Sequence, residues 1–152
     1  MFVFSHYSDN IPYSPPRVAR IELVPWDDAY SVDNPLIDSE HREIVRLLNL
    51  LYEDWRSGAS RFDILALHDE LMANFELHFA NEEEMLVRYG CPRLGEHVVE
   101  HIKLTAELRD IGQSLFSCDQ DEGEAHLRAF LRMMLDEHVR TFDRDLMTVQ
   151  PH

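Results

Sequence analysis

The chain has 152 residues, of which 45% are hydrophobic and five are glycine, a composition typical of one globular domain with a single core. Its 29 acidic and 14 basic residues leave a formal charge of −15, and such a surface repels phosphate backbones, so nucleic acid is not an expected partner. No stretch approaches the ~18–20 apolar residues that span a bilayer, so membrane insertion is not expected either.

The sequence indicates a cytoplasmic protein. Its first residues have no basic start followed by an apolar run, so a signal peptide is not expected. Cys91 and Cys118 are too few and too isolated for a cysteine-based metal site. In a reducing compartment we expect them to be free thiols, and we assign them no role.

The chain is predicted to consist of an extended N-terminal arm, residues 1–35, and a helical domain, residues 36–148. The arm is rich in proline and lacks helical periodicity, and Trp26 is its expected anchor on the domain. Apolar residues at helical spacing then predict four helices, at about 37–56, 61–89, 92–116 and 121–146. Four long helices with short connections favour an all-α, up-down-up-down antiparallel four-helix bundle.

Groups that are costly to bury interrupt the apolar stripes of these helices. Two histidine–carboxylate or histidine–histidine pairs lie four residues apart, so each pair projects from one helix face and can address a common ion. Buried polar groups of this kind persist when they are paired or bind a metal. The inward-facing set comprises His41, His78, Glu82, His97, His101 and His138.

Asp143 and His68 require separate consideration. Asp143 follows His138 by five residues, about 140° around an ideal helix, so it is either an exposed aspartate or is brought inward by a helix distortion. His68 lies on the same stripe as His78 but about 15 Å away along the helix axis, and we interpret it as structural.

The number and type of these groups indicate two metal ions. Imidazole suits zinc, copper, iron and nickel, whereas carboxylates favour harder ions. Five histidines and two carboxylates are too many for one tetrahedral zinc ion but fit two octahedral ions that share bridging carboxylates. Iron is therefore the predicted metal.

The pattern resembles the hemerythrins, especially the bacterial single-domain type. The resemblance covers about residues 24–146 and rests on the segments Ile37-Asp38-Ser39-Glu40-His41 and His78-Phe79-Ala80-Asn81-Glu82-Glu83, His97 with His101, and His138 followed by Asp143. It implies a non-haem di-iron centre with an oxo or hydroxo bridge. One iron is then held by His97, His101 and His138, the other by His41 and His78, and Glu82 and Asp143 bridge them.

The resemblance also implies that the second iron, with one fewer protein ligand, offers the position at which O2 binds. Phe79, Met134 and Leu135 are predicted to form the apolar wall beside it. Tryptophan is common in the family where Met134 stands, and glutamine where Glu40 stands, so the pocket departs from the usual pattern.

The expected function is reversible O2 binding for carriage, storage or delivery, and not enzymatic catalysis. The alternatives are sensing of O2 or redox state, with an unidentified protein partner, and scavenging of peroxide or nitric oxide at the same centre. A metal-free structural bundle is the remaining possibility. A carrier would also require a protein recipient of O2, which the sequence does not identify.

Overall fold

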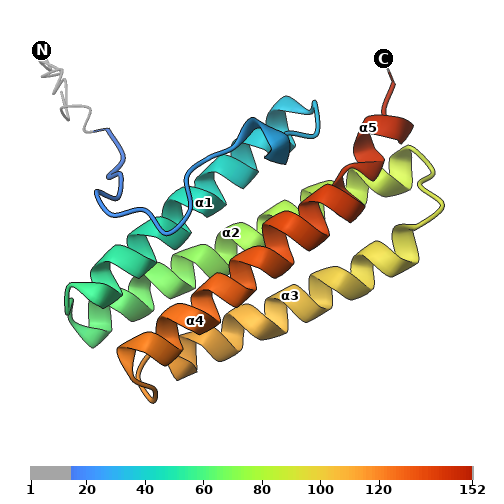
Figure 1. Cartoon of the computed structure of the whole chain (residues 1–152). Helices are drawn as coiled ribbons and strands as arrows, with labels where there is room; N and C mark the ends of the chain where they lie inside the picture. The colour runs from blue at the N-terminus through green and yellow to red at the C-terminus, as the bar shows by residue number, and fades with distance from the viewer. Residues whose placement is uncertain (1–14, 152) are drawn as a thin grey trace, which may run out of the picture.

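The protein is a bundle of four long antiparallel helices in the computed structural model, which describes residues 15–151 (Figure 1). The helices are α1 (Pro35–Arg56), α2 (Arg61–Arg88), α3 (Leu94–Ser114) and α4 (Gln120–Leu131). The chain of α4 continues as a π-helical segment, η2 (Arg132–Asp143), and then as the short helix α5 (Asp145–Val149). The predicted all-α, up-down-up-down bundle is confirmed.

The helix ends follow local chemistry. Asn34 accepts a hydrogen bond from the Ile37 amide and precedes Pro35, which begins α1 without needing an amide donor. Ser60 accepts the Asp63 amide at the start of α2, and Gly90, with φ of 66°, follows its end. The first three helices begin and end within about two residues of the predicted limits, as fraying at helix ends allows, and α4 begins within about one residue of its predicted start.

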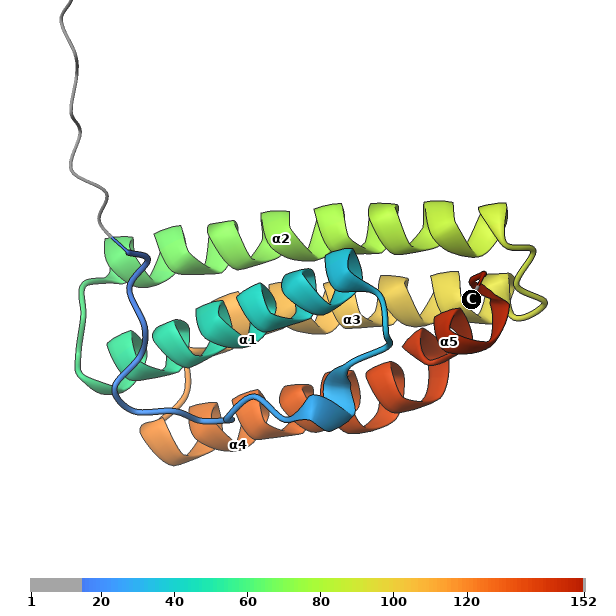
Figure 2. The same ribbon diagram turned by 90° about the horizontal axis from the view of Figure 1, so that it is seen from above.

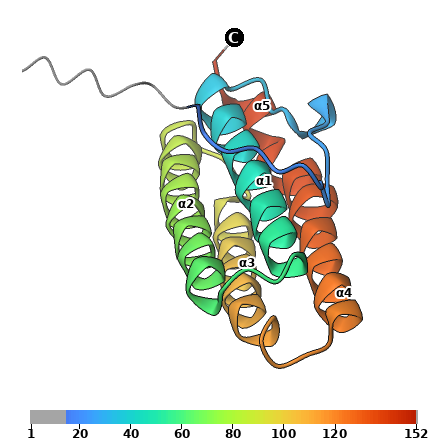
Figure 3. The same cartoon turned by 90° about the vertical axis from the view of Figure 1, so that its left-hand side faces the viewer.

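The apolar stripes of the four helices meet in one core. Figure 3 shows α4 beside α1 and α3 beside α2, so each helix turns its buried face toward the bundle axis. Phe75 and Phe130 are the largest fully buried side chains, and their rings meet edge to face with centroids 5.8 Å apart. A second apolar cluster, around Ile37 and Leu86, closes the end of the bundle where α5 lies. The side chains predicted as metal ligands occupy helix positions between the residues of these two clusters.

The described part of the arm runs along the bundle beside α1 and α4 (Figure 2). The expected anchor, Trp26, is half-buried and packs against the core, with Arg42 Cζ 4.7 Å from the centre of its ring. Buried polar side chains of α1 also hold the arm. Asp38 accepts hydrogen bonds from the Val32 amide (2.8 Å) and the Ser31 hydroxyl (2.7 Å). The short 3₁₀ helix η1 (Asp28–Tyr30) precedes this contact. Residues 1–14 of the predicted arm lie outside the described residues.

Asn49 makes the second attachment of the arm. Its side-chain oxygen accepts the amides of Leu23 (2.8 Å) and Val24 (2.9 Å), and its amide nitrogen donates to the Val24 carbonyl (2.6 Å). One side chain on a helix thus replaces the backbone partners that the arm lacks.

Among residues 15–151, no helix has the length and apolarity needed to cross a bilayer.

Replacing Asn49 with alanine should release this part of the arm. Three backbone groups would lose their partners, and since a buried unsatisfied group costs about 1–3 kcal/mol, we expect a loss of about 2–4 kcal/mol in the free energy of unfolding. Hydrogen exchange at the Leu23 and Val24 amides should become fast. Asn74→Ala is the matched control, because the Asn74 side chain bonds only to the Glu70 carbonyl of its own helix. Unchanged protection at both amides would show that Asn49 does not hold the arm.

Candidate metal centre

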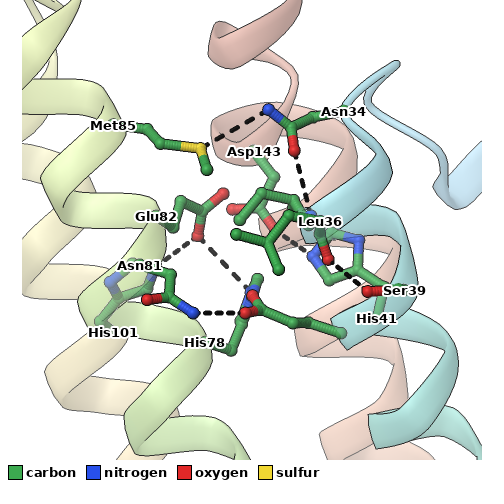
Figure 4. Close-up of polar contacts among 12 residues, drawn as sticks. Asn34, Leu36, Ser39, His41, His78, Asn81, Glu82, Met85, His101 and Asp143 are labelled. Carbon is green, nitrogen blue, oxygen red and sulfur yellow. Dashed lines mark hydrogen bonds and ion pairs between the residues drawn. The ribbon is translucent and has the colours of Figure 1, made fainter.

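All seven residues predicted as ligands lie together inside the bundle. They come from α1, α2, α3 and η2, and each is 2% exposed or less. Figure 4 shows Glu82 and Asp143 among the imidazoles of His41, His78 and His101. The complete set is His41, His78, Glu82, His97, His101, His138 and Asp143.

The ligating atoms fall into two groups that share Asp143. In the larger group, one atom from each of five residues lies within 4.8 Å of all the others: Glu82, His97, His101, His138 and Asp143. In the smaller group, His41, His78 and Asp143 meet the same condition. The division matches the number of histidines predicted for each of two metal positions, three and two. Glu82 also approaches the smaller group, since its Oε2 lies 3.6 Å from His78 Nε2.

Asp143 reaches the site because the helix around it is not a regular α-helix. From Arg132 to Asp143 the backbone is π-helical, a conformation whose hydrogen bonds join residues five apart. His138 and Asp143, which are five apart, therefore face the same side, and His138 Nε2 lies 2.8 Å from Asp143 Oδ1. The single regular helix predicted for 121–146 is wrong in this part. The distortion considered from the sequence is present and spans twelve residues.

The residues fit a bound cation. Within residues 15–151, seven buried side-chain nitrogen or oxygen atoms have no hydrogen-bond partner, and all belong to six of the predicted ligands. His138 Nε2 and His41 Nε2 are among them, although they lie 2.8 and 3.1 Å from Asp143 oxygens. Their contacts thus lack hydrogen-bond alignment. Buried polar groups normally find partners, and a metal ion would supply one to several of these atoms at once.

The protonation states of the site also suit a cation. Burial lowers the pKa of His101 to about 2 and lowers the pKa of His78, so both rings are neutral near pH 7, the form that binds metal. Burial, and then the neighbouring Asp143, raise the pKa of Glu82 well above its usual range. Burial opposes ionisation of Asp143 too, but His138 and the other imidazoles hold its pKa below the usual range. An incoming cation would displace the proton from Glu82.

The outer nitrogens of three imidazoles have identifiable partners. His41 Nδ1 lies 3.3 Å from the Tyr30 carbonyl oxygen, which the arm supplies. His78 Nδ1 and His101 Nδ1 contact the carboxylates of Glu40 (2.9 Å) and Glu83 (2.7 Å). From the sequence, Glu40 is identified only as a pocket position where glutamine is common, and its contact with His78 is not predicted. Glu40 directly precedes His41 in the sequence, which was a sign that it could lie near the site, but the histidine it contacts, His78, is on another helix.

The three residues predicted to line the O2 pocket lie in different surroundings. Phe79 stacks on the His101 ring, with centroids 3.9 Å apart, and lines a groove of about 400 Å³ between α2 and α3. Met134 and Leu135 are buried in η2. Leu135 lines a separate cavity of about 230 Å³ between the arm and α4, together with Tyr30.

His68 stands apart from the seven. It is buried near the other end of α2, and its Nε2 lies 2.7 Å from the Leu108 carbonyl oxygen. Gly112 makes room for the ring, since a Cβ at this glycine would lie 2.6 Å from His68 Cε1. The ring thus fills a fitted site between α2 and α3, as expected for a structural histidine.

A helical bundle with a buried cluster of histidines and carboxylates is the arrangement of a metal-binding four-helix bundle protein. The family model described as "Hemerythrin HHE cation binding domain" matches residues 33–149. That match covers most of the chain, so the chain belongs to the hemerythrin family.

Curated relatives agree with this membership. The chain is 27% identical over 123 residues to the bacteriohemerythrin of Clostridium acetobutylicum, covering 79% of this chain and 95% of the relative. It is 30% identical over 125 residues to the bacteriohemerythrin of Stenotrophomonas maltophilia, covering 80% and 78%. The myohemerythrin of Riftia pachyptila is 27% identical over 118 residues, covering 78% and 86%. The resemblance inferred from the motifs is confirmed.

Proposed function

We propose that the chain binds O2 reversibly at a centre of two non-haem iron ions. His97, His101 and His138 would hold one ion, and His41 and His78 the other. Glu82 and Asp143 would contact both. The observation that carries this proposal is that the buried ligating atoms form two groups with Asp143 in common.

The donor set supports iron rather than a harder or softer ion. Imidazole nitrogens and carboxylate oxygens together suit iron, whereas thiolates are absent from both groups among the described residues. Two shared carboxylates bring two negative charges to a site otherwise lined by neutral rings. A pair of cations would offset the repulsion between those buried carboxylates.

The unequal donor groups favour binding of a small ligand at one position. His41 and His78 provide two imidazoles where the other position has three, so the protein leaves that position with fewer donors. When bound, the two ferrous ions supply the electrons for reversible O2 binding. Phe79 contacts the centre by stacking on the His101 ring, and we propose that Phe79 and the buried side chains of Met134 and Leu135 exclude water from it.

The ligand types also favour carriage over oxygenation. Di-iron enzymes on ferritin-like bundles use four carboxylates and Glu-x-x-His motifs, and this chain contains no Glu-x-x-His. Neutral imidazoles give the centre less negative charge with which to stabilise high-valent iron. We therefore propose a carrier or store of O2 that is not an enzyme, in the cytoplasm, with any protein recipient still to be identified.

An optical spectrum tests this proposal. Anaerobically reduced protein containing two irons per chain should gain charge-transfer absorption on exposure to air and lose it when O2 is removed. Rapid turnover of peroxide or nitric oxide with a reductant, far above that of free iron, would favour scavenging instead. Fewer than two irons per chain, or a spectrum that does not revert, would contradict the carrier.

Replacing Met134 with tryptophan should slow the conversion of the oxygenated protein to its oxidised form. Met134 is 1% exposed and lies four residues before His138, so a larger ring there would further restrict water near the centre. We expect a decrease of several-fold in the autoxidation rate, measured by stopped-flow absorption. Melting curves would control for overpacking, which costs about 1–3 kcal/mol. An unchanged rate in a folded variant would contradict the role of Met134 in the pocket.

A further inference from the structure

Two carboxylates outside the predicted ligand set contact predicted ligand histidines at Nδ1, the ring nitrogen that faces away from the centre. Glu40 Oε2 lies 2.9 Å from His78 Nδ1, and Glu83 Oε1 lies 2.7 Å from His101 Nδ1. In both rings the other nitrogen, Nε2, is directed to the interior, where it is 3.6 Å from Glu82 Oε2 in His78 and 3.1 Å in His101. Each imidazole thus lies between an outer carboxylate and the centre.

Both contacts join different helices. Glu40 is on α1 and reaches His78 on α2, while Glu83 is on α2 and reaches His101 on α3. The second oxygen of Glu40 accepts a hydrogen bond from the Asn81 side chain, which is also visible in Figure 4. Each carboxylate therefore holds a ligand of the next helix in the bundle.

A carboxylate in this position has a defined effect on a metal-binding histidine. A carboxylate that accepts a hydrogen bond from Nδ1–H keeps the proton on Nδ1 and the lone pair on Nε2, fixes the orientation of the ring and makes the ring a stronger electron donor. The other three ligand histidines have weaker support. His41 faces a backbone carbonyl at 3.3 Å, and Nδ1 of His97 and of His138 has no hydrogen-bond partner within residues 15–151.

The two carboxylates are distributed one to each group of ligands. His78 belongs to the smaller group and His101 to the larger. We propose that Glu40 and Glu83 are positioning residues, each of which sets the affinity and the reduction potential of one iron position. This inference rests on the proposed di-iron centre, and it assigns separate roles to two residues that are not ligands.

The chain offers a matched control for these two residues. Glu84 follows Glu83 on α2, but its side chain is exposed and pairs only with Arg88, at 2.8 Å. Glu84→Gln removes the same charge from the same helix without touching a ligand. Glutamine is the preferred replacement at all three positions, because it keeps the shape and an oxygen acceptor but removes the negative charge.

Anaerobic titration of iron-free protein with ferrous iron tests the proposal. Loss of such an outer partner typically lowers metal affinity by about 10–100-fold. Glu40→Gln and Glu83→Gln should each weaken one of the two binding events by up to that factor, because a neutral amide oxygen accepts the Nδ1 hydrogen bond less strongly than a carboxylate, and Glu84→Gln should weaken neither. The midpoint potential should become more positive in the first two variants only, since a poorer electron donor stabilises ferric iron less.

The His78→Ala background separates the two positions. One ion should remain there, and Glu83→Gln should weaken its binding while Glu40→Gln should not. Circular dichroism checks the fold. If Glu40→Gln does not fold, Asn81→Ala serves in its place, because it keeps both charges and only frees the Glu40 carboxylate, and it should weaken the same event to a smaller extent.

Wild-type protein that binds two irons, with affinities and potentials unchanged in both glutamine variants, would overturn the positioning roles alone. Equal weakening of both ions by either variant would overturn their assignment to separate positions. Wild-type protein that binds no iron would overturn the di-iron proposal and this inference with it.

Discussion

Asp143→Ala should abolish binding of both iron ions. Asp143 is the residue shared by the two ligand groups, and its oxygens lie 2.9 Å from His97 Nε2 and 3.1 Å from His41 Nε2. Removing a buried anion that both cations contact should lower the affinity for each by at least about 100-fold, or about 3 kcal/mol. Metal analysis of the purified variant after anaerobic loading measures this loss.

Two further variants make the result specific. His78→Ala removes a residue of the smaller group only, so the protein should keep one iron per chain. His68→Gln replaces another buried histidine, outside the centre, and the protein should keep both irons. An Asp143→Ala protein that retains two irons at wild-type affinity would refute a shared carboxylate at this position.

Removal of iron should lower the melting temperature by about 10 °C. The buried polar atoms without partners all belong to predicted ligands, and each unsatisfied group costs about 1–3 kcal/mol in the iron-free fold. Iron that binds only the folded state at 1,000 times its dissociation constant adds about 4 kcal/mol of stability. For a domain of this size, about 1 kcal/mol corresponds to a shift of about 2–4 °C.

Calorimetry of iron-loaded and chelator-treated protein under anaerobic conditions measures this difference. The Asp143→Ala variant is the control, since its melting temperature should not respond to iron or chelator. Equal melting temperatures for the loaded and iron-free wild-type protein would mean that metal binding and folding are not coupled at this site.

The helical part of the fold was predictable because its determinants are local. Apolar residues at helical spacing, Pro35 at a helix start and Gly90 after a helix end are properties of neighbouring residues, and they placed the first three helices to within a few residues. The inward phase of His41, His78 and His138 followed from the same periodicity. The attachment of the arm was predicted only in part: Trp26 packs against the core as expected, but the contact with Asn49, a helix residue 25 positions away from Val24, was not predicted.

The buried cluster of histidines and carboxylates was predictable for a second reason. Groups that are costly to bury stand out in an apolar stripe, and their order and spacing resembled a known family, which included Asp143. The two carboxylates that contact the outer nitrogens of His78 and His101 were not predictable in this way. Glu40 and Glu83 lie among many acidic residues of a chain with a charge of −15, and nothing in their spacing separates them from Glu84.

The sequence by itself therefore determined the helices, the bundle and the candidate ligands, since each follows from periodicity within a single helix or from a motif. Only the tertiary structure decided how the ligands divide into two groups, how the π-helical segment turns Asp143 inward, and which carboxylates support His78 and His101. These features depend on distances between helices, which are set by the packing of whole helix faces and not by any short stretch of sequence.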